Sequence, residues 1–409
     1  VGPVRGLRGF WSACAVMAGF SQGGGVGLAL ANWMIHDDPG FDVFAMDIAR
    51  YGDFATMAYT NARVRENYAR RFSIRFPNEE LKAARGLRTT PIHGELKAAG
   101  AQFGAAHGLE VPLWFAPQGV EDRFSWRRST DFEHVGAEAR GVRDGVGLME
   151  ISGFAKYRIT GAGSTDWLDR LLACRLPGQG RMTLAPMLKQ DGRLIGDFTL
   201  ARLNDNEWFL AGSGIAEDYH MRWFEQHLPD DGSVEIEAYG GNLVGLSIAG
   251  PQARQVLQKV TQTDVSAEAF RFMHFVRMDI GMAEALVGRV SFTGDLGYEI
   301  WMKPELQRHV FNELMDAGAG FGIRLFGLRA LNALRLEKGF GGWAREYRPL
   351  YGPCETGLDR FVAYDKPADF MGKAAAIAER QDGGAMRLCT FVVDATDADV
   401  IGDEPISLD

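Results

Sequence analysis

Apolar and polar residues alternate along several stretches of the chain, and this period of two is typical of half-buried β-strands. The clearest stretch is 155–160, where Ala155, Tyr157 and Ile159 alternate with basic and hydroxyl residues. Other apolar runs bounded by turn residues predict further strands at 181–188, 194–203, 207–212, 243–249, 275–280, 284–292 and 298–302.

Apolar residues that recur every three or four positions predict helices between these strands. These helices are expected at 62–72, 164–172, 215–227, 304–317 and 325–338. The second would bury Trp167, Leu168, Leu171 and Leu172 on one face. Ser164 and Thr165 are expected to cap its N-terminus, and Pro251 to occupy the first position of another helix. Because strands and helices come in blocks rather than in strict alternation, the pattern predicts an α+β fold.

Near the start of the chain, an apolar patch at 10–20 is followed by Gly23-Gly24-Gly25-Val26-Gly27 and then by an apolar run at 28–35. Strand, glycine turn and helix in this order are typical of a loop that contacts a nucleotide or a flavin. The glycines lack the G-x-G-x-x-G spacing of a dinucleotide fingerprint, so a plain tight turn remains an alternative.

Composition narrows the class of protein. With 409 residues and 46% hydrophobic content, two or three domains are expected, and a net charge of −9 argues against nucleic acid or an anionic membrane as the main partner. The four cysteines contain no C-x-x-C pair, which predicts a reducing compartment without a zinc or disulfide framework. The histidines show no metal-ligand spacing, so no metal site is expected.

The ends of the sequence suggest a piece of a longer protein. It begins at Val1 rather than at methionine, without the pattern of a signal peptide, and it stops just after a strand-like segment at 386–393. We interpret it as a fragment truncated at both ends.

Two carboxylates occupy unusual positions inside predicted strands. Asp197 interrupts the apolar run 194–200, and Glu299 lies between apolar residues of the strand at 298–302. Aspartate is depleted in strands, and a buried charge is costly unless it is paired. The pair therefore suggests recognition of a cationic or hydrogen-bond-donating ligand, although a turn network at Asp197 and a surface position for Glu299 remain alternatives.

Several separated motifs occur in the order found in one enzyme family. They are the glycine run with Ala31-Asn32-Trp33-Met34-Ile35, the segment 59–72, Trp114-Phe115, Asp197-Phe198-Thr199, Phe292-Thr293-Gly294-Asp295-Leu296-Gly297-Tyr298-Glu299 and Leu334-Arg335-Leu336-Glu337-Lys338-Gly339. Together they resemble the dimethylglycine and sarcosine dehydrogenase family. Its members join an FAD-linked amine oxidase region to a folate region similar to the glycine cleavage T-protein (aminomethyltransferase).

The resemblance implies a domain plan. Residues 1–53 would be the tail of the FAD-dependent amine oxidoreductase domain, 54–118 a connector, 119–380 the T-protein-like folate-binding region and 381–409 the start of a truncated C-terminal β-barrel. The flavin pocket would lie mostly outside this chain. Gly23, Gly24 and Gly25 would then present the N-terminus of the following helix to the flavin edge.

The resemblance also implies roles in binding tetrahydrofolate. Asp197 would be the catalytic carboxylate beside the folate amine nitrogens, and Glu299 would accept hydrogen bonds from the pterin ring. The remaining folate contacts would be Phe292, Leu184, Ser213, Arg329 and Tyr298. Three of these depart from the T-protein pattern, since Phe292 and Leu184 stand where tyrosines are expected and Ser213 where an asparagine is expected.

Other polar and aromatic residues are given structural roles. Arg335 and Glu337 are expected to form an ion pair, and His220 to be a surface residue. Trp343 and Tyr347 are expected in the core or in a cleft wall.

Three functions remain open from the sequence. The favoured one is oxidation of a small N-methylated amine with capture of the carbon as 5,10-methylene-tetrahydrofolate. A stand-alone aminomethyl- or methyltransferase and a non-catalytic folate-binding regulatory protein are the alternatives. The expected location is the bacterial cytoplasm or the mitochondrial matrix, and the oligomeric state is left open.

Overall fold

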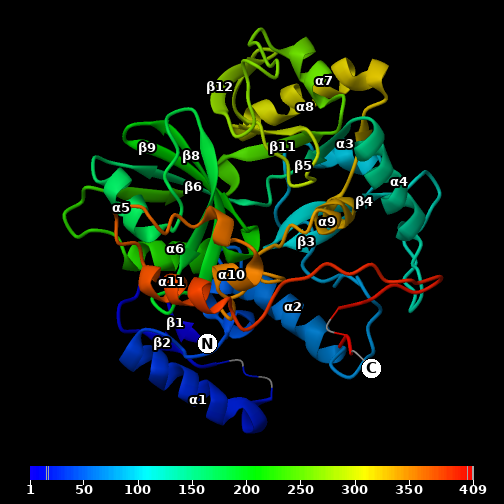
Figure 1. The fold of residues 1–409 in the computed structure, drawn as a ribbon. Coiled ribbons are helices and arrows are strands. Elements are labelled where there is room, and N and C mark those ends of the chain that lie inside the picture. Colours follow the sequence, from blue (N-terminus) through cyan, green and yellow to red (C-terminus); the bar gives the residue numbers. More distant parts are fainter. Residues whose placement is uncertain (15, 17, 403, 408–409) are drawn as a thin grey trace.

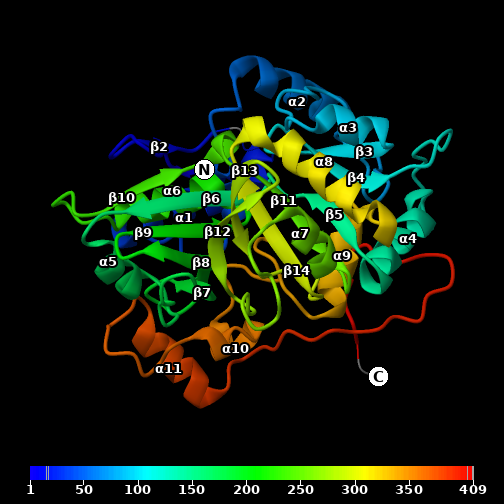
Figure 2. The same cartoon turned by 90° about the horizontal axis from the view of Figure 1, so that it is seen from above.

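Two β-sheets covered by helices form the body of the protein in the computed structural model, which describes residues 1–14, 16, 18–402 and 404–407 (Figures 1 and 2). Ala15 and Met17 of the predicted apolar patch lie outside the described residues. Sheets and helices occur in blocks along the chain, so the α+β prediction is confirmed.

The first sheet has five antiparallel strands in the order β10-β6-β9-β8-β7. Their bounds are β6 Ala155–Thr160, β7 Met182–Leu188, β8 Leu194–Asn204, β9 Glu207–Gly212 and β10 Glu235–Ala238. Helices α5 Ser164–Leu171 and α6 Glu217–Gln226 and the later helix α11 Lys373–Asp382 contribute to the core on one face of this sheet. That core includes Tyr157, Phe198, Phe224 and Trp343.

The second sheet has six strands in the order β12-β13-β14-β11-β5-β15. Their bounds are β5 Gly147–Glu150, β11 Val244–Ala249, β12 Phe275–Ile280, β13 Ala283–Gly288, β14 Gly297–Met302 and the parallel strand β15 Arg324–Leu325. One face packs against α7 Ala253–Val260 and α8 Gln307–Gly318. The other face meets α4 Asp131–Asp144 and α9 Leu328–Glu337.

A shared core joins the two sheets. Phe209 of β9 stacks on Phe275 of β12 with ring centroids 5.2 Å apart, and it lies 5.9 Å from Trp301 of β14. Backbone bonds from Met182 to Met273 and from Phe275 to Gly180, each 2.9 Å, link the sheets at one corner. The inner faces of the two sheets are therefore held in a fixed relation.

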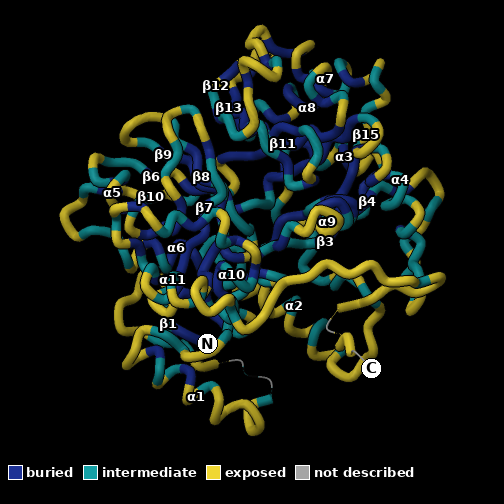
Figure 3. Tube along the Cα trace, viewed as in Figure 1, coloured by how far each residue is buried: buried dark blue, intermediate teal, exposed yellow. Residues whose placement is uncertain are grey.

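The N-terminal segment packs against both sheets: its first part lies against α6 of the first sheet, whereas its last helix and the hairpin that follows pack against the second sheet and its helices α4 and α9. It contains the short strands β1 Gly2–Pro3 and β2 Trp11–Ser12 and the helices α1 Gly19–His36, α2 Met57–Ala69 and α3 His93–Ala98, followed by the hairpin of β3 Ala101–Ala106 and β4 Leu109–Phe115. The buried pair Asp47–Arg222, 2.6 Å apart, ties this segment to α6. Of α1, only Ala29 and Trp33 are buried, and much of the helix is exposed in Figure 3.

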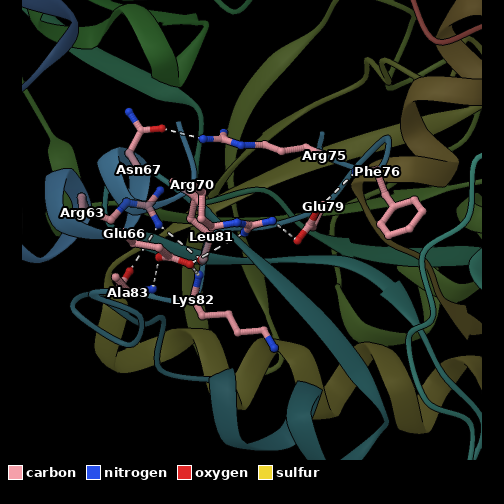
Figure 4. Close-up of polar contacts among 10 residues, drawn as sticks. All are labelled: Arg63, Glu66, Asn67, Arg70, Arg75, Phe76, Glu79, Leu81, Lys82 and Ala83. Carbon is pink, nitrogen blue, oxygen red and sulfur yellow. Dashed lines mark hydrogen bonds and ion pairs between the residues drawn. The ribbon is translucent and has the colours of Figure 1, made fainter. Parts of the chain in front are cut away.

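Polar contacts fold the loop after α2 back onto that helix (Figure 4). The Glu66 carboxylate accepts hydrogen bonds from the backbone nitrogens of Lys82 (2.9 Å) and Ala83 (2.6 Å). Arg70 pairs with Glu79. No residue of α2 is buried, so polar contacts rather than apolar packing hold this loop against the helix.

Several local predictions need correction. Gly163 is the N-cap of α5 and no side-chain cap bond forms, so Ser164 and Thr165 are already helical. Helix α7 begins at Ala253, two residues after Pro251. The strand predicted at 284–292 ends at Gly288.

The segment 386–393 is not a strand but an exposed coil that continues from α11 past the short helix α10 Pro353–Thr356 (Figures 1 and 3). Backbone groups of a strand need a neighbouring strand as partner. No strand among the described residues pairs with this segment, so its β-propensity alone does not form one.

Candidate folate site

Asp197 lies on the face of β8 that turns toward the second sheet. Along the strand, Phe198 and Leu200 belong to the core under α6, whereas Ala201 belongs to the core shared by the sheets. Because side chains alternate across a strand, Asp197 and Thr199 share the face of Ala201. Ile195 departs from this alternation where the β7–β8 register shifts near Leu188.

One oxygen of the Asp197 carboxyl lacks a hydrogen-bond partner among the described residues. Its Oδ1 atom is buried without a hydrogen-bond partner, although the residue as a whole is only partly covered. Burial raises the pKa of Asp197 to about 7, and the negative charge of Glu346 contributes to the rise. A carboxyl of this kind can both hold and accept a proton at neutral pH.

Leu184 and Ser213 lie beside Asp197 on the same sheet. Leu184 pairs in register with Thr199, and Thr199 pairs with Ala211. Ser213 follows Gly212, the last residue of β9, and lies two residues beyond Ala211 in the direction of Asp197. Register therefore gathers these predicted site residues around one end of β8.

Glu299 lies on the inner face of the second sheet. Its neighbours Tyr298 and Ile300 belong to the core under α7 and α8, whereas Trp301 belongs to the core shared by the sheets. Because side chains alternate along a strand, Glu299 points away from the face of Tyr298 and Ile300 and toward the face of Trp301. Burial raises the pKa of Glu299 to about 7, and the nearby Trp301 indole offsets the rise in part.

Phe292 borders the same inner region from the loop between β13 and β14. It packs against the shared core, and its ring stacks on Phe340 with centroids 6.2 Å apart. The Arg335 guanidinium carbon lies 6.0 Å from the Phe292 ring centroid. An aromatic ring and two carboxyls whose pKa values are raised to about 7 thus border the inner faces of the two sheets.

Tyr298 is not part of this arrangement. Its ring is fully buried and stacks on Phe270 with centroids 5.8 Å apart, and its hydroxyl accepts a hydrogen bond from Arg254. It points to the opposite face of β14 from Glu299, because the two are consecutive strand residues. Tyr298 therefore has a structural role in the core and lies outside the candidate site.

Arg329 is occupied by protein partners. Its guanidinium pairs with Asp131 at 2.8 Å and donates to the Asn78 carbonyl at 3.2 Å. The ion pair joins α9 to the first turn of α4. These contacts give Arg329 a structural role and leave the predicted contact with folate without support.

The glycine run is not a turn before a helix. Gly23, Gly24 and Gly25 lie inside α1, which begins at Gly19, and none of them has a positive φ. Backbone N–H groups within a helix bond to carbonyls of the preceding turn and do not form an anion site. The expected flavin-facing helix N-terminus at these glycines is therefore wrong.

Two further predictions fail because of partners far away in the sequence. Arg335 pairs with Glu346 at 3.1 Å, whereas Glu337 pairs with Arg143. Residues two apart on a helix face different directions. His220 is fully buried, and its Nε2 lies 2.9 Å from the Ile195 carbonyl oxygen.

Sequence reasoning missed Glu346 altogether. It lies in an irregular segment between α9 and α10, next to Trp343 and Tyr347, which are both buried as core or wall residues. The only signal in the sequence is an acidic residue between aromatic ones, which is too common to single out a site.

The described residues contain no group of histidine, cysteine or acidic side chains arranged to hold a metal ion. All four cysteines are free. No helix in the described part of the chain has the length and apolar character needed to cross a bilayer.

Comparison with known proteins identifies the folds present. The model of the GCVT N-terminal domain matches residues 92–366, and that of the FAD dependent oxidoreductase central domain matches residues 36–90. A crystal structure of glycine cleavage system aminomethyltransferase T from Bartonella henselae superposes with a TM-score of 0.62 at 23% identity, covering 73% of this chain and 76% of that one. This similarity supports the fold.

Curated relatives extend the similarity to nearly the whole chain. Mitochondrial dimethylglycine dehydrogenase of Mus musculus is 37% identical over 99% of this chain and 47% of its own length. Mitochondrial sarcosine dehydrogenase of Homo sapiens is 29% identical over 96% of this chain and 48% of its own length. The chain thus spans about half the length of these relatives. It belongs to the family of the GCVT N-terminal domain, and it is similar to dimethylglycine and sarcosine dehydrogenases along nearly its whole length.

Proposed function

We propose that this chain is the folate-dependent part of an FAD-dependent N-methyl amine dehydrogenase. In this role it captures the one-carbon unit of a small N-methylated amine on tetrahydrofolate, giving 5,10-methylene-tetrahydrofolate. The observation that carries the proposal is the placement of two carboxyls with raised pKa, Asp197 and Glu299, on the inner faces of two joined sheets.

The donor and acceptor chemistry of these residues fits a reduced folate. A pterin ring presents amino and N–H donors, which suit a carboxylate acceptor such as Glu299. Phe292 offers an aromatic face for stacking. Asp197 has a buried oxygen without a protein partner, which is the type of atom that a ligand donor satisfies.

The proposed division of labour follows from these positions. Tetrahydrofolate supplies the nitrogen atoms that take up the carbon. Asp197 accepts the proton released at those nitrogens and stabilises positive charge that develops beside it. Glu299 and Phe292 hold the ring, while Leu184 and Ser213 border the reacting side.

The redox half of the activity is a proposal for the whole protein. A match to the FAD dependent oxidoreductase central domain at residues 36–90 supports it. The glycines in α1 lie inside the helix and do not fit a flavin contact. The domain limits at 53, 118 and 380 likewise remain proposals.

The relatives' names support one proposed location. Both name mitochondrial proteins, so a eukaryotic source would favour the mitochondrial matrix. Four free cysteines agree with a reducing compartment. The bacterial cytoplasm remains the proposed counterpart.

Calorimetric titration of the chain with tetrahydrofolate tests the binding site. We expect binding, and Glu299→Gln should weaken it about 10-fold or more because a charge-assisted hydrogen bond is lost. Glu284→Gln, which changes a carboxylate 66% exposed on the same sheet, is the control and should bind normally. Absence of binding by the unaltered chain would exclude the proposal.

The catalytic assignment is tested in the full-length protein during oxidation of an N-methylated amine. Asp197→Asn should lower the rate of 5,10-methylene-tetrahydrofolate formation by about 100-fold or more, and free formaldehyde should appear instead. An unchanged ratio of folate product to formaldehyde would show that Asp197 is not the catalytic carboxylate.

A further inference from the structure

A buried lysine, Lys156 of β6, lies on the inner face of the first sheet. Its neighbours Ala155 and Tyr157 belong to the core under α6, so Lys156 points to the opposite face of the strand. Its side chain is only 1% exposed, although lysine is almost never fully buried unless its charge has a partner. The partners of this charge therefore decide what Lys156 does.

Strand register connects Lys156 to residues of the candidate folate site. Lys156 lies opposite Ala211 of β9, and Ala211 lies opposite Thr199 of β8. Thr199 in turn lies opposite Leu184 of β7. Because residues directly opposite each other share one face of a sheet, these four form a row across the inner face. Asp197 lies two residues before Thr199 on that same face, so Lys156 faces the region bordered by Leu184 and Asp197.

Lys156 also lies against the second sheet. Its Nζ atom is 5.8 Å from the ring centroid of Trp301. Glu299 and Trp301 lie two residues apart on the inner face of β14, a separation of about 7 Å along a strand. The ammonium group of Lys156 is therefore beside the part of β14 that carries Glu299.

The ammonium group has more donors than partners. Within the described part of the chain, its one hydrogen bond goes to the Ser152 carbonyl oxygen at 2.7 Å, whereas an ammonium has three N–H donors. Burial lowers the pKa of Lys156 to about 8, and the negative charges of Glu217 and Glu150 oppose this effect, so the group is charged at pH 7. A buried donor without a partner costs free energy, which a ligand with an acceptor atom would recover.

From this placement, and resting on the proposed function, we infer that Lys156 is a further folate-binding residue that donates to the carbonyl oxygen of the pterin ring. In a pterin, this oxygen lies on the same ring edge as the amino and N–H donors that suit Glu299. A carboxylate and an ammonium side by side on the protein match the donors and the acceptor of that edge. Lys156 thereby selects a ring with an oxygen at this position, since an amino group there would place a donor against the ammonium.

Calorimetric titration at pH 7 with two ligands tests the inference in the unaltered chain and in Lys156→Met. The ligands are tetrahydrofolate and its 4-amino-4-deoxy analogue, in which an amino group replaces the carbonyl oxygen. Lys156→Met should weaken tetrahydrofolate binding by about 10-fold or more, because a charge-assisted hydrogen bond is lost. Binding of the analogue should change by less than about 3-fold, since the analogue has no acceptor for the ammonium. A residue with only a structural role would change both affinities alike.

Lys259→Met is the matched control. Lys259 of α7 likewise donates to a backbone carbonyl, that of Ala317 at 3.5 Å, and its Nζ atom lies 4.5 Å from the ring centroid of Phe321. Helix α7 packs on the far face of the second sheet, so this variant should bind both ligands as the unaltered chain does.

Unchanged tetrahydrofolate binding by folded Lys156→Met, or an equal loss for the two ligands, would overturn the inference and leave the proposed function standing. Absence of tetrahydrofolate binding by the unaltered chain would instead overturn the proposed function and the inference with it. If Lys156→Met does not fold, Lys156→Gln removes the charge but keeps a donor for the Ser152 carbonyl. A selective loss of tetrahydrofolate binding, of about 3-fold or more, is then expected, and an equal effect on both ligands would again overturn the inference.

Discussion

The ionisation of Asp197 opposes folding. Its pKa rises from an ordinary value near 4 to about 7 in the folded chain. Between these values the folded state holds a proton that the unfolded state has released, so stability falls as pH rises through this window. Above about pH 7 the full cost of the buried charge is present.

Asp197→Asn should therefore stabilise the chain at alkaline pH while it removes activity. We expect an increase of about 1–3 kcal/mol in the free energy of unfolding at pH 8 and a much smaller change at pH 4.5. Urea unfolding at the two pH values measures the difference. Asp205→Asn, at a site 87% exposed, should show no such dependence, and a loss of stability in Asp197→Asn at pH 8 would contradict the argument.

Among the connecting elements, Lys366 provides the main anchor for the end of α5. Its amino group donates to the carbonyls of Asp169, Leu172 and Cys174 and to the Asp169 carboxylate, all within 3.1 Å. Leu172 is the C-cap of α5, where the last carbonyls of a helix lack partners. A cation at this end is also favoured by the helix dipole.

Lys366→Met should cost about 2–4 kcal/mol, because it leaves several buried carbonyls without a donor. Thermal or urea unfolding measures this loss. Lys373→Met is the comparison, since that amino group bonds only to the Lys366 and Ala368 carbonyls, and a smaller loss is expected. Equal losses in the two variants would show that the hydrogen bonds of Lys366 stabilise the fold no more than those of Lys373.

The local pattern of apolar and polar residues was sufficient to predict the strands and helices that bury one face. The strands around Asp197 and Glu299 were predicted because their apolar residues alternate, and burial against a helix layer enforces that period. The turn predicted from the glycine run was wrong, because the preference of glycine for turns is a local property. Helix α1 is instead held in place by Trp33, which packs on Arg222 and Trp11. The strand predicted at 386–393 was also wrong. A segment with strand propensity forms a strand only beside a partner strand, and none of the described residues provides one.

At the scale of the whole molecule, the candidate site depends on contacts between distant segments. Asp197 and Glu299 could be singled out because each is a charge within an apolar strand. Their shared inner region, and the contribution of Glu346, depend on sheet packing and on a segment without regular structure. No periodicity in the sequence encodes such a contact.

The geometry of the site should therefore be sensitive to the core between the sheets and insensitive to the core behind them. Phe209→Leu shortens the side chain that bridges β9 to β12 and β14, whereas Phe311→Leu makes the same change in α8 on the far side of the second sheet. Both should lower the free energy of unfolding by about 1–2 kcal/mol. Only Phe209→Leu should also weaken tetrahydrofolate binding, by about 5-fold or more, because a misplacement of the two carboxyls by a fraction of an ångström lowers their complementarity to the ligand. Calorimetric titration of both variants decides the matter: equal binding by the two would show that the inter-sheet core fixes stability alone, and that Asp197 and Glu299 do not act on one ligand.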